Sequence, residues 1–133
     1  MTSREIDKLP DLVSWGRFAP VAANPALIAE SEKIWEFNLN GEPLMYAGFK
    51  NVRHIYPGLY LWMLPTVLFD LKPLAGFRAT RVALDKHMRE EGQNVWCIVD
   101  PTVQGCVKLI ELLGFVPLGF TYEQSKLIYG KDL

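Results

Sequence analysis

The residues most able to do acid–base chemistry lie far apart in this 133-residue sequence. His54, in a loop that precedes an apolar run, is the candidate general base, because the pKa of histidine lies close to neutral pH. The other ionisable candidates have simpler roles. We expect Glu42 to be solvated beside a turn, Asp70 and Asp100 to cap turns or helices, and His87 to lie on a helix surface.

The sequence contains none of the short motifs that carry hydrolase, redox, zinc or nucleotide chemistry. Patterns such as Gly-x-Ser-x-Gly, Cys-x-x-Cys, His-Glu-x-x-His and the Gly-Lys-Ser/Thr phosphate loop are missing. Cys97 and Cys106 stand in apolar surroundings, without partners at the spacing of metal ligands. We therefore expect buried free thiols in a reducing compartment, and no metal site.

Composition and charge describe a packed globular chain rather than a disordered or nucleic-acid-binding one. Half of the residues are apolar, 22% are charged, and the formal net charge is −1. No overall basic field draws such a chain to nucleic acid, so nucleic acid is not an expected partner. Residues 1–5 are polar, which argues against a signal peptide. The longest apolar run, residues 59–71, contains Pro65 and Asp70, so we expect no membrane segment.

The first half of the chain must supply a helix and a hairpin. Trp35, Phe37 and Leu39 alternate with polar residues, and Asn40-Gly41 supplies two residues that tolerate positive φ in a tight turn. We expect a helix at 5–18, a loop at 19–25, a helical turn at 26–31, and strands at 33–39 and 44–49.

The second half alternates strands with helices. Residues 59–64 form a continuous apolar run that is typical of a central strand covered on both faces. Phe77, Leu84 and Met88 form a helical stripe that ends at Gly92. We expect a loop at 51–58, helices at 77–91 and 102–113, and strands at 59–64, 94–99, 116–122 and 126–129. Four tryptophans are expected in the core: Trp15, Trp35, Trp62 and Trp96.

This element order predicts a single α/β (α+β) domain over residues 1–133. A meander followed by a strand-helix-strand-helix-strand core implies a mixed, mostly antiparallel central sheet with helices on its faces.

One C-terminal segment resembles a known family. A strand ending in Val99-Asp100 leads into a helix with a basic residue at Lys108, and the helix closes on Leu-Gly-Phe at 113–115. This run resembles the GNAT (N-acetyltransferase-like) fold, and most closely the GNAT-like internal virion proteins of short-tailed phages. The strand with Trp62 and Leu64, followed by Thr66, is similar to the same group.

The resemblance implies where a cofactor would lie. In GNAT enzymes the central strand and its neighbour splay apart and hold the pantetheine arm of acyl-CoA, and amides at the next helix hold its pyrophosphate. The cofactor-binding residues implied here, with acetyl-CoA as the possible cofactor, are Leu64, Thr66, Ala75, Gly76 and Arg78. The chain departs from the family pattern at Ala75 and Phe77, which replace two glycines.

The family's catalytic residues are replaced as well. The Asn and the Tyr of the last helix correspond to Val103 and Ile110, which cannot donate a proton. Two functions therefore stay open. The first is a phage-encoded, catalytically degenerate GNAT-fold protein that acts in the virion or its assembly. The alternative is an acyl-CoA-dependent N-acetyltransferase acting on a small amine or host protein. Both imply a phage or host protein partner, and location in the host cytoplasm or the virion.

Overall fold

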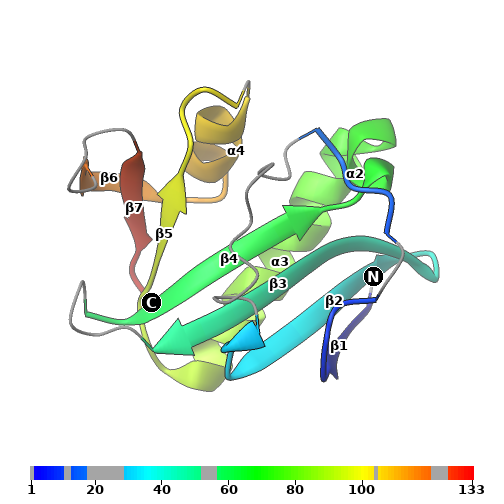
Figure 1. Ribbon diagram of the computed structural model, residues 1–133, viewed down its shortest axis with the longest axis horizontal. Helices are drawn as coiled ribbons and strands as arrows, with labels where there is room; N and C mark the ends of the chain where they lie inside the picture. The colour runs from blue at the N-terminus through cyan, green and yellow to red at the C-terminus, as the bar shows by residue number, and fades with distance from the viewer. Residues whose placement is uncertain (1, 11–12, 18–28, 52–56, 104, 121–125) are drawn as a thin grey trace.

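A seven-stranded sheet is the framework of the computed structural model, which describes residues 2–10, 13–17, 29–51, 57–103, 105–120 and 126–133 (Figure 1). The strands lie in the order β1-β2-β3-β4-β5-β7-β6. Of the registered strand pairs, β4–β5 is parallel and the other five are antiparallel. The predicted mixed, mostly antiparallel α/β architecture is confirmed.

The elements follow one another as strands first and then alternating helices and strands. In chain order they are β1 (Thr2–Ile6), β2 (Lys33–Leu39), β3 (Glu42–Asn51), β4 (Leu59–Pro65), α2 (Val67–Leu71), α3 (Pro73–Glu91), β5 (Val95–Val99), α4 (Cys106–Leu112), β6 (Val116–Phe120) and β7 (Leu127–Lys131).

The sheet has two covered faces because its side chains alternate across the pleat. We call the side that α3 covers the α3 face and the opposite side the second face. The larger core cluster joins the sheet to α3 and α4 and includes Trp35, Phe37, Phe49, Leu61, Leu84, Met88 and Ile110. The smaller cluster lies on the second face and consists of Ile34, Tyr46, Trp62 and Leu64, with Ile6, Leu9 and Val13 packed against it.

Local signals correctly placed two turns within the described residues. Asn40 and Gly41 both have positive φ, 53° and 82°, and close the predicted hairpin between β2 and β3. Gly92 ends α3 in the left-handed conformation, with its N–H bonded to the carbonyl of Met88. The four strands predicted at 33–39, 44–49, 59–64 and 94–99 are confirmed, with shifts of up to two residues at their ends.

The predicted helix at 5–18 is wrong. Residues 2–6 form β1, which pairs antiparallel with β2, and the described residues that follow are not helical. Ile6, Leu9 and Val13 do pack against the core, as their apolar character suggested. The error arose because a short strand followed by extended chain can bury the same apolar set as an amphipathic helix.

The helix bounds also differ from expectation. α3 begins at Pro73 rather than at 77, because proline fits the first turn of a helix, where its missing N–H costs nothing. α4 begins at Cys106, after a turn, rather than at 102. The loop predicted at 19–25, most of the helical turn at 26–31 and the end of the strand at 116–122 lie outside the described residues. None of the described helices is long and apolar enough to cross a bilayer.

A glycine on β3 makes room for the largest side chain of the second face. A Cβ on Gly48 would lie 2.4 Å from the ring of Trp62, which stands opposite it on β4. The indole N–H of Trp62 donates to Ser31 Oγ at 2.6 Å, so the ring cannot shift without losing this bond.

Gly48→Ala should therefore lower the free energy of unfolding by about 1–3 kcal/mol, the usual cost of overpacking. Equilibrium urea unfolding measures the change. Gly41→Asn is the control, because nothing lies within 4 Å of that position and asparagine tolerates its positive φ. A Gly48→Ala protein as stable as the unsubstituted chain would contradict the packing described here.

Candidate functional site

The two central strands separate along their length. β4 pairs with β5 only at Leu59/Val95 and Tyr60/Trp96, although the strands continue to Pro65 and Val99. Figure 1 shows them moving apart toward their carboxyl ends. This is the splay that the family resemblance implied. Because backbone groups alternate in direction along a strand, Met63 and Pro65 face the same side as Leu59, whose N–H bonds to Asn94 next to β5.

The end of β4 on this side is occupied by the chain's own N-terminal region. The N–H of Gly16 donates to the carbonyl of Pro65 at 2.9 Å, and the N–H of Val67 donates to the carbonyl of Ser14 at 2.8 Å. Trp15 thereby forms an antiparallel bridge with Thr66. We call residues 13–17 the N-terminal strap. It extends the hydrogen bonding of β4 at the point where β5 no longer supplies a partner.

Further contacts of Trp15, Gly16 and Arg17 hold the strap in place. The backbone N–H of Arg17 donates to Asp70 Oδ2 at 2.9 Å, and the Arg17 side chain lies 3.8 Å from Oδ1 of the same carboxylate. Asp70 was predicted to cap a turn or helix, but it lies inside α2 and binds the strap, 53 positions away along the chain. A Cβ on Gly16 would lie 2.5 Å from the carbonyl oxygen of Thr66, so only glycine permits the close approach. The ring of Trp15 meets Tyr46 edge-on at 5.8 Å.

Three of the predicted cofactor-binding residues have internal roles. Leu64 is buried in the second-face cluster. The Thr66 hydroxyl lies 2.8 Å from the carbonyl of Pro43 and 3.0 Å from that of Leu44, so it ties β4 to β3. Gly76 is buried, its N–H bonds to the carbonyl of Lys72 at 2.8 Å, and a Cβ there would touch Phe69.

The other predicted site residues lie in more open places. Ala75 and Arg78 are exposed in the first two turns of α3. The structure therefore spreads the predicted set over the core, the β3–β4 link and the helix surface rather than gathering it around one ligand. His54, the candidate base, lies outside the described residues.

The positions of the family's acid and helix-opening residues offer no proton donor. Ile110 is buried in the core beneath α4, and Val103 lies half-buried in the turn before that helix. Asp100 accepts bonds from the Thr102 hydroxyl (2.6 Å), the Thr102 N–H (2.9 Å) and the Lys126 ammonium (2.9 Å). Thr102 first and Lys126 second hold the pKa of Asp100 at about 2, so it is a weak base. Asp100 was expected to cap a helix, but its bonds to Thr102 close the turn that precedes α4.

A buried acid on β2 escaped the sequence analysis. Glu36 accepts a bond from the Arg4 guanidinium at 2.9 Å and from the Tyr46 hydroxyl at 2.9 Å. Burial raises the pKa of Glu36, but the bonds from Arg4 and Tyr46 outweigh it and hold this pKa below its ordinary value. Burial, followed by the bond to Glu36, raises the pKa of Tyr46 to about 12. A carboxylate with a lowered pKa is a poor general base. The role of Arg4, Glu36 and Tyr46 is therefore structural, because their hydrogen bonds join β1, β2 and β3.

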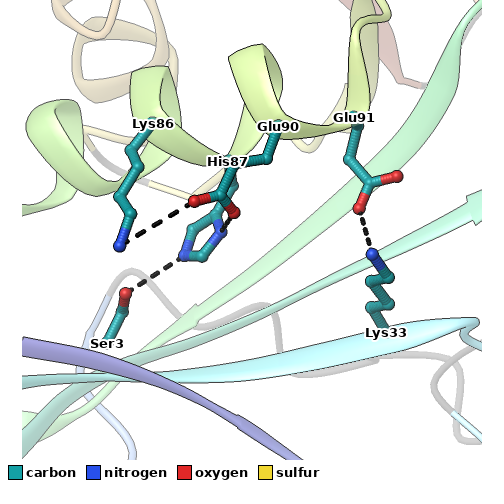
Figure 2. A network of polar contacts seen from close by, with 6 residues as sticks. All are labelled: Ser3, Lys33, Lys86, His87, Glu90 and Glu91. Atoms are coloured by element: carbon teal, nitrogen blue, oxygen red, sulfur yellow. Dashed lines mark hydrogen bonds and ion pairs between the residues drawn. The ribbon is translucent and has the colours of Figure 1, made fainter.

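His87 and Trp15 lie elsewhere than predicted. His87 is only 5% exposed rather than on a helix surface, because α3 crosses β1 and β2 there and presses the ring onto Trp35. Figure 2 shows its two nitrogens pointing to Ser3 and Glu90. Trp15 was expected in the core but is 42% exposed, because the strap lies at the edge of β4. The burial of His87 could have been predicted, because this histidine lies within the apolar stripe of its helix.

The two cysteines are free thiols, Cys97 buried and Cys106 partly buried. Burial raises the pKa of both thiols, so neither is a reactive thiolate at neutral pH. Within the described residues no group of histidine, cysteine, aspartate and glutamate side chains could hold a metal ion.

Solved structures with the GNAT fold are similar to this chain, whereas comparisons of its sequence find no match. No protein-family model matches the sequence, and no curated protein is similar to it. A Bordetella pertussis protein assigned to the GNAT-family acetyltransferases is similar in structure, with a TM-score of 0.56 and 19% identity over 74% of this chain and 65% of its own. The ribosomal-protein-S5-alanine acetyltransferase of Vibrio fischeri has a TM-score of 0.56 and 15% identity, over 75% of this chain and 61% of its own.

An N-acetyltransferase from Staphylococcus aureus is similar over more of its length, with a TM-score of 0.57, 11% identity and coverage of 86% of this chain and 78% of its own. The chain thus spans less than two thirds of the length of the Bordetella and Vibrio proteins. At such identities these likenesses show the GNAT fold alone, and the likeness to phage proteins rests on the sequence.

Glu36 makes stability depend on acid pH. Its folded pKa lies below the ordinary value of 4.5, so its stabilising effect is present above that pH and is lost as the pH falls through the folded value. The unfolding free energies of the unsubstituted chain and of Glu36→Gln should therefore differ most near neutral pH and converge in acid. Urea unfolding at a series of pH values measures this. A difference that stays constant with pH would contradict the argument.

Gly16→Ala should detach the strap, because its Cβ cannot fit beside the Thr66 carbonyl. Loss of the two strap bonds should lower the unfolding free energy by roughly 1–3 kcal/mol and expose the Val67 N–H. Hydrogen exchange followed by NMR should then show faster exchange at Val67. Ser14→Ala keeps the backbone carbonyl that accepts this bond and is the matched control. Unchanged protection of Val67 in Gly16→Ala would refute the strap.

Proposed function

We propose that this chain is a phage-encoded GNAT-fold protein that has lost acetyl transfer and acts through contacts with a phage or host protein, in the virion or its assembly. The observation that carries the proposal is the N-terminal strap on the end of β4. A cofactor following the family's route would lie along this edge. Here the Pro65 carbonyl and the Val67 N–H are already bonded to Gly16 and Ser14.

The edge has also lost a donor. Pro65 faces the side of β4 away from β3 and has no N–H, so that position cannot bond to a pantetheine arm. A bound cofactor would have to displace the strap and break two backbone bonds, and it would find one N–H donor fewer than usual on this edge. With Val103 and Ile110 in place of the family's Asn and Tyr, no described residue at the expected positions could protonate a departing thiolate.

Exposed apolar side chains support a protein partner. Leu71 is 73% exposed and Leu74 is 61% exposed at the junction of α2 and α3, and Val67 lies one turn before Leu71 on α2. Apolar side chains gathered on a surface are typical of protein contact sites. Such a role fits either location that the sequence suggested, the host cytoplasm or the virion.

The alternative function is an acyl-CoA-dependent N-acetyltransferase acting on a small amine or a host protein. The separation of β4 from β5 favours it, since GNAT enzymes use that feature to hold acyl-CoA. In this alternative Ala75 and Arg78, exposed at the start of α3, would hold the pyrophosphate, because a helix N-terminus favours an anion. His54 is the candidate base.

Acetyl-CoA binding separates the two functions. The proposal expects no change in melting temperature with millimolar acetyl-CoA and no acetylation of amines such as spermidine or of lysine peptides. A ligand present at about 100 times its Kd would add roughly 2.7 kcal/mol of stability. A clear stabilisation together with amine turnover would overturn the proposal in favour of the transferase.

A matched variant identifies the site if stabilisation is seen. Ala75→Glu places a negative charge in the first turn of α3, where it should repel a pyrophosphate and abolish the effect of acetyl-CoA. Glu42→Gln, in the hairpin between β2 and β3, is the control and should leave that effect unchanged.

A further inference from the structure

Where α3 crosses β1 and β2, a hydroxyl, an imidazole and a carboxylate lie in line (Figure 2). Ser3 Oγ lies 3.2 Å from Nε2 of His87, and Nδ1 of the same ring lies 3.2 Å from Oε2 of Glu90. A nucleophile within hydrogen-bonding reach of a base, with the base oriented by a third group, is the arrangement that activates hydroxyl groups. None of the three residues belongs to the edge of β4.

The imidazole is held in one orientation. Its ring stacks on Trp35 with centroids 4.3 Å apart and planes 28° apart, and it lies nearly parallel to Phe37 at 5.8 Å. Both aromatic side chains stand on β2 at adjacent positions of the α3 face. The ring therefore cannot swing away from Ser3 or Glu90 without breaking this packing.

Burial also sets the protonation of the base. Burial lowers the pKa of His87 by more than the hydrogen bond to Glu90 raises it. The ring is therefore neutral at physiological pH. A carboxylate can only accept a hydrogen bond, so the proton of the neutral ring lies on Nδ1 and faces Glu90. The lone pair of Nε2 is then directed at Ser3 and can accept the proton of its hydroxyl.

The nucleophile is less buried than the base. Ser3 is half-buried on β1, the strand at one end of the sheet, and the Glu90 side chain is 53% exposed. Lys86 Nζ lies 3.9 Å from Glu90 Oε1 and brings a positive charge to the same side of α3. The Ser3 hydroxyl thus belongs to a residue that keeps part of its surface in solvent, on the strand that ends the sheet.

We propose that Ser3, His87 and Glu90 form a nucleophile–base–carboxylate relay in which Ser3 reacts with activated carboxylic esters. The bond from Ser3 Oγ to the acyl carbon forms as the hydroxyl proton passes to His87 Nε2. The bond from that carbon to the alcohol oxygen then breaks, and the proton leaves with the alcohol. Water, deprotonated by the same nitrogen, releases the carboxylic acid and restores the Ser3 hydroxyl.

This chemistry is independent of acetyl-CoA and of the proposed assembly role. A fluorophosphonate probe tests it directly, because the probe phosphonylates an activated serine oxygen and loses fluoride. Tandem mass spectrometry then locates the modified residue. The relay predicts labelling at Ser3 in the folded chain and its loss in urea, where the three groups separate.

Matched variants separate activation from mere exposure. Ser3→Ala should abolish labelling at this position, and Glu90→Gln and His87→Gln should slow it at least tenfold, since general-base catalysis typically contributes about 10²–10⁴-fold. Glu91→Gln removes the neighbouring carboxylate, which instead bonds to Lys33 at 2.6 Å, and should leave the rate unchanged. Ser14→Ala removes an exposed serine outside the relay and should also have no effect. Far-UV circular dichroism confirms that each variant is folded.

The pH dependence distinguishes a base from a structural link. The labelling rate should rise as His87 loses its proton, with a midpoint below the ordinary histidine value of 6.5, and then level off. The charged groups around the relay are Lys86, Glu90 and Glu91 on α3, Lys33 on β2 and Glu5 on β1. Labelling at Ser3 no faster than at Ser14, or equally fast in Glu90→Gln, would overturn the proposal.

Discussion

β4 has to satisfy two rows of backbone hydrogen-bonding groups, and β5 pairs with only the beginning of one of them. On one side β3 pairs with it from Leu59 to Pro65. On the other side β5 leaves after Tyr60, and the groups at Pro65 and Val67 bond to the strap instead. Because unpaired backbone groups are costly away from water, any chain that adopts this divergence must supply a ligand or a piece of itself there. This chain supplies a piece of itself at the end of the strand.

The bonding of the strap to the end of β4 determines how the N-terminal region folds. The strap must pass close to Thr66, which requires glycine at position 16, and it must bring apolar side chains onto the second face. β1 then completes the sheet beside β2 and brings Arg4 to the buried carboxylate of Glu36 on one side. On its other side β1 places Ser3 beside His87. The described residues of the N-terminal region thus pack on the second face, close the end of β4 and meet α3.

The structural neighbours share this framework while their names describe acetyl transfer to different molecules. A fold shared at identities between 11% and 19% is a scaffold on which sites differ. In this chain two of the residues that the family resemblance assigned to a cofactor, Thr66 and Gly76, serve the packing of the fold. α2 follows β4 directly and contacts α3 and β3, Gly76 serves core packing, and the Thr66 hydroxyl ties two strands together. The chain thus shares the framework of these neighbours, and its own strap occupies the end of β4.

The sequence by itself determined the elements whose signals are local. Alternation in β2, the Asn40-Gly41 turn, the apolar run of β4, and the Gly92 and Gly114 helix ends all depend on neighbouring residues, and the element order predicted the mixed sheet. Only the tertiary structure decided what the N-terminal region does, because its spacing of apolar residues suits a helix as well as an extended strap. It alone buried His87 and Glu36 and gave them partners 84 and 32 positions away along the chain, at Ser3 and Arg4. Such contacts depend on how the elements pack, and no local pattern encodes them.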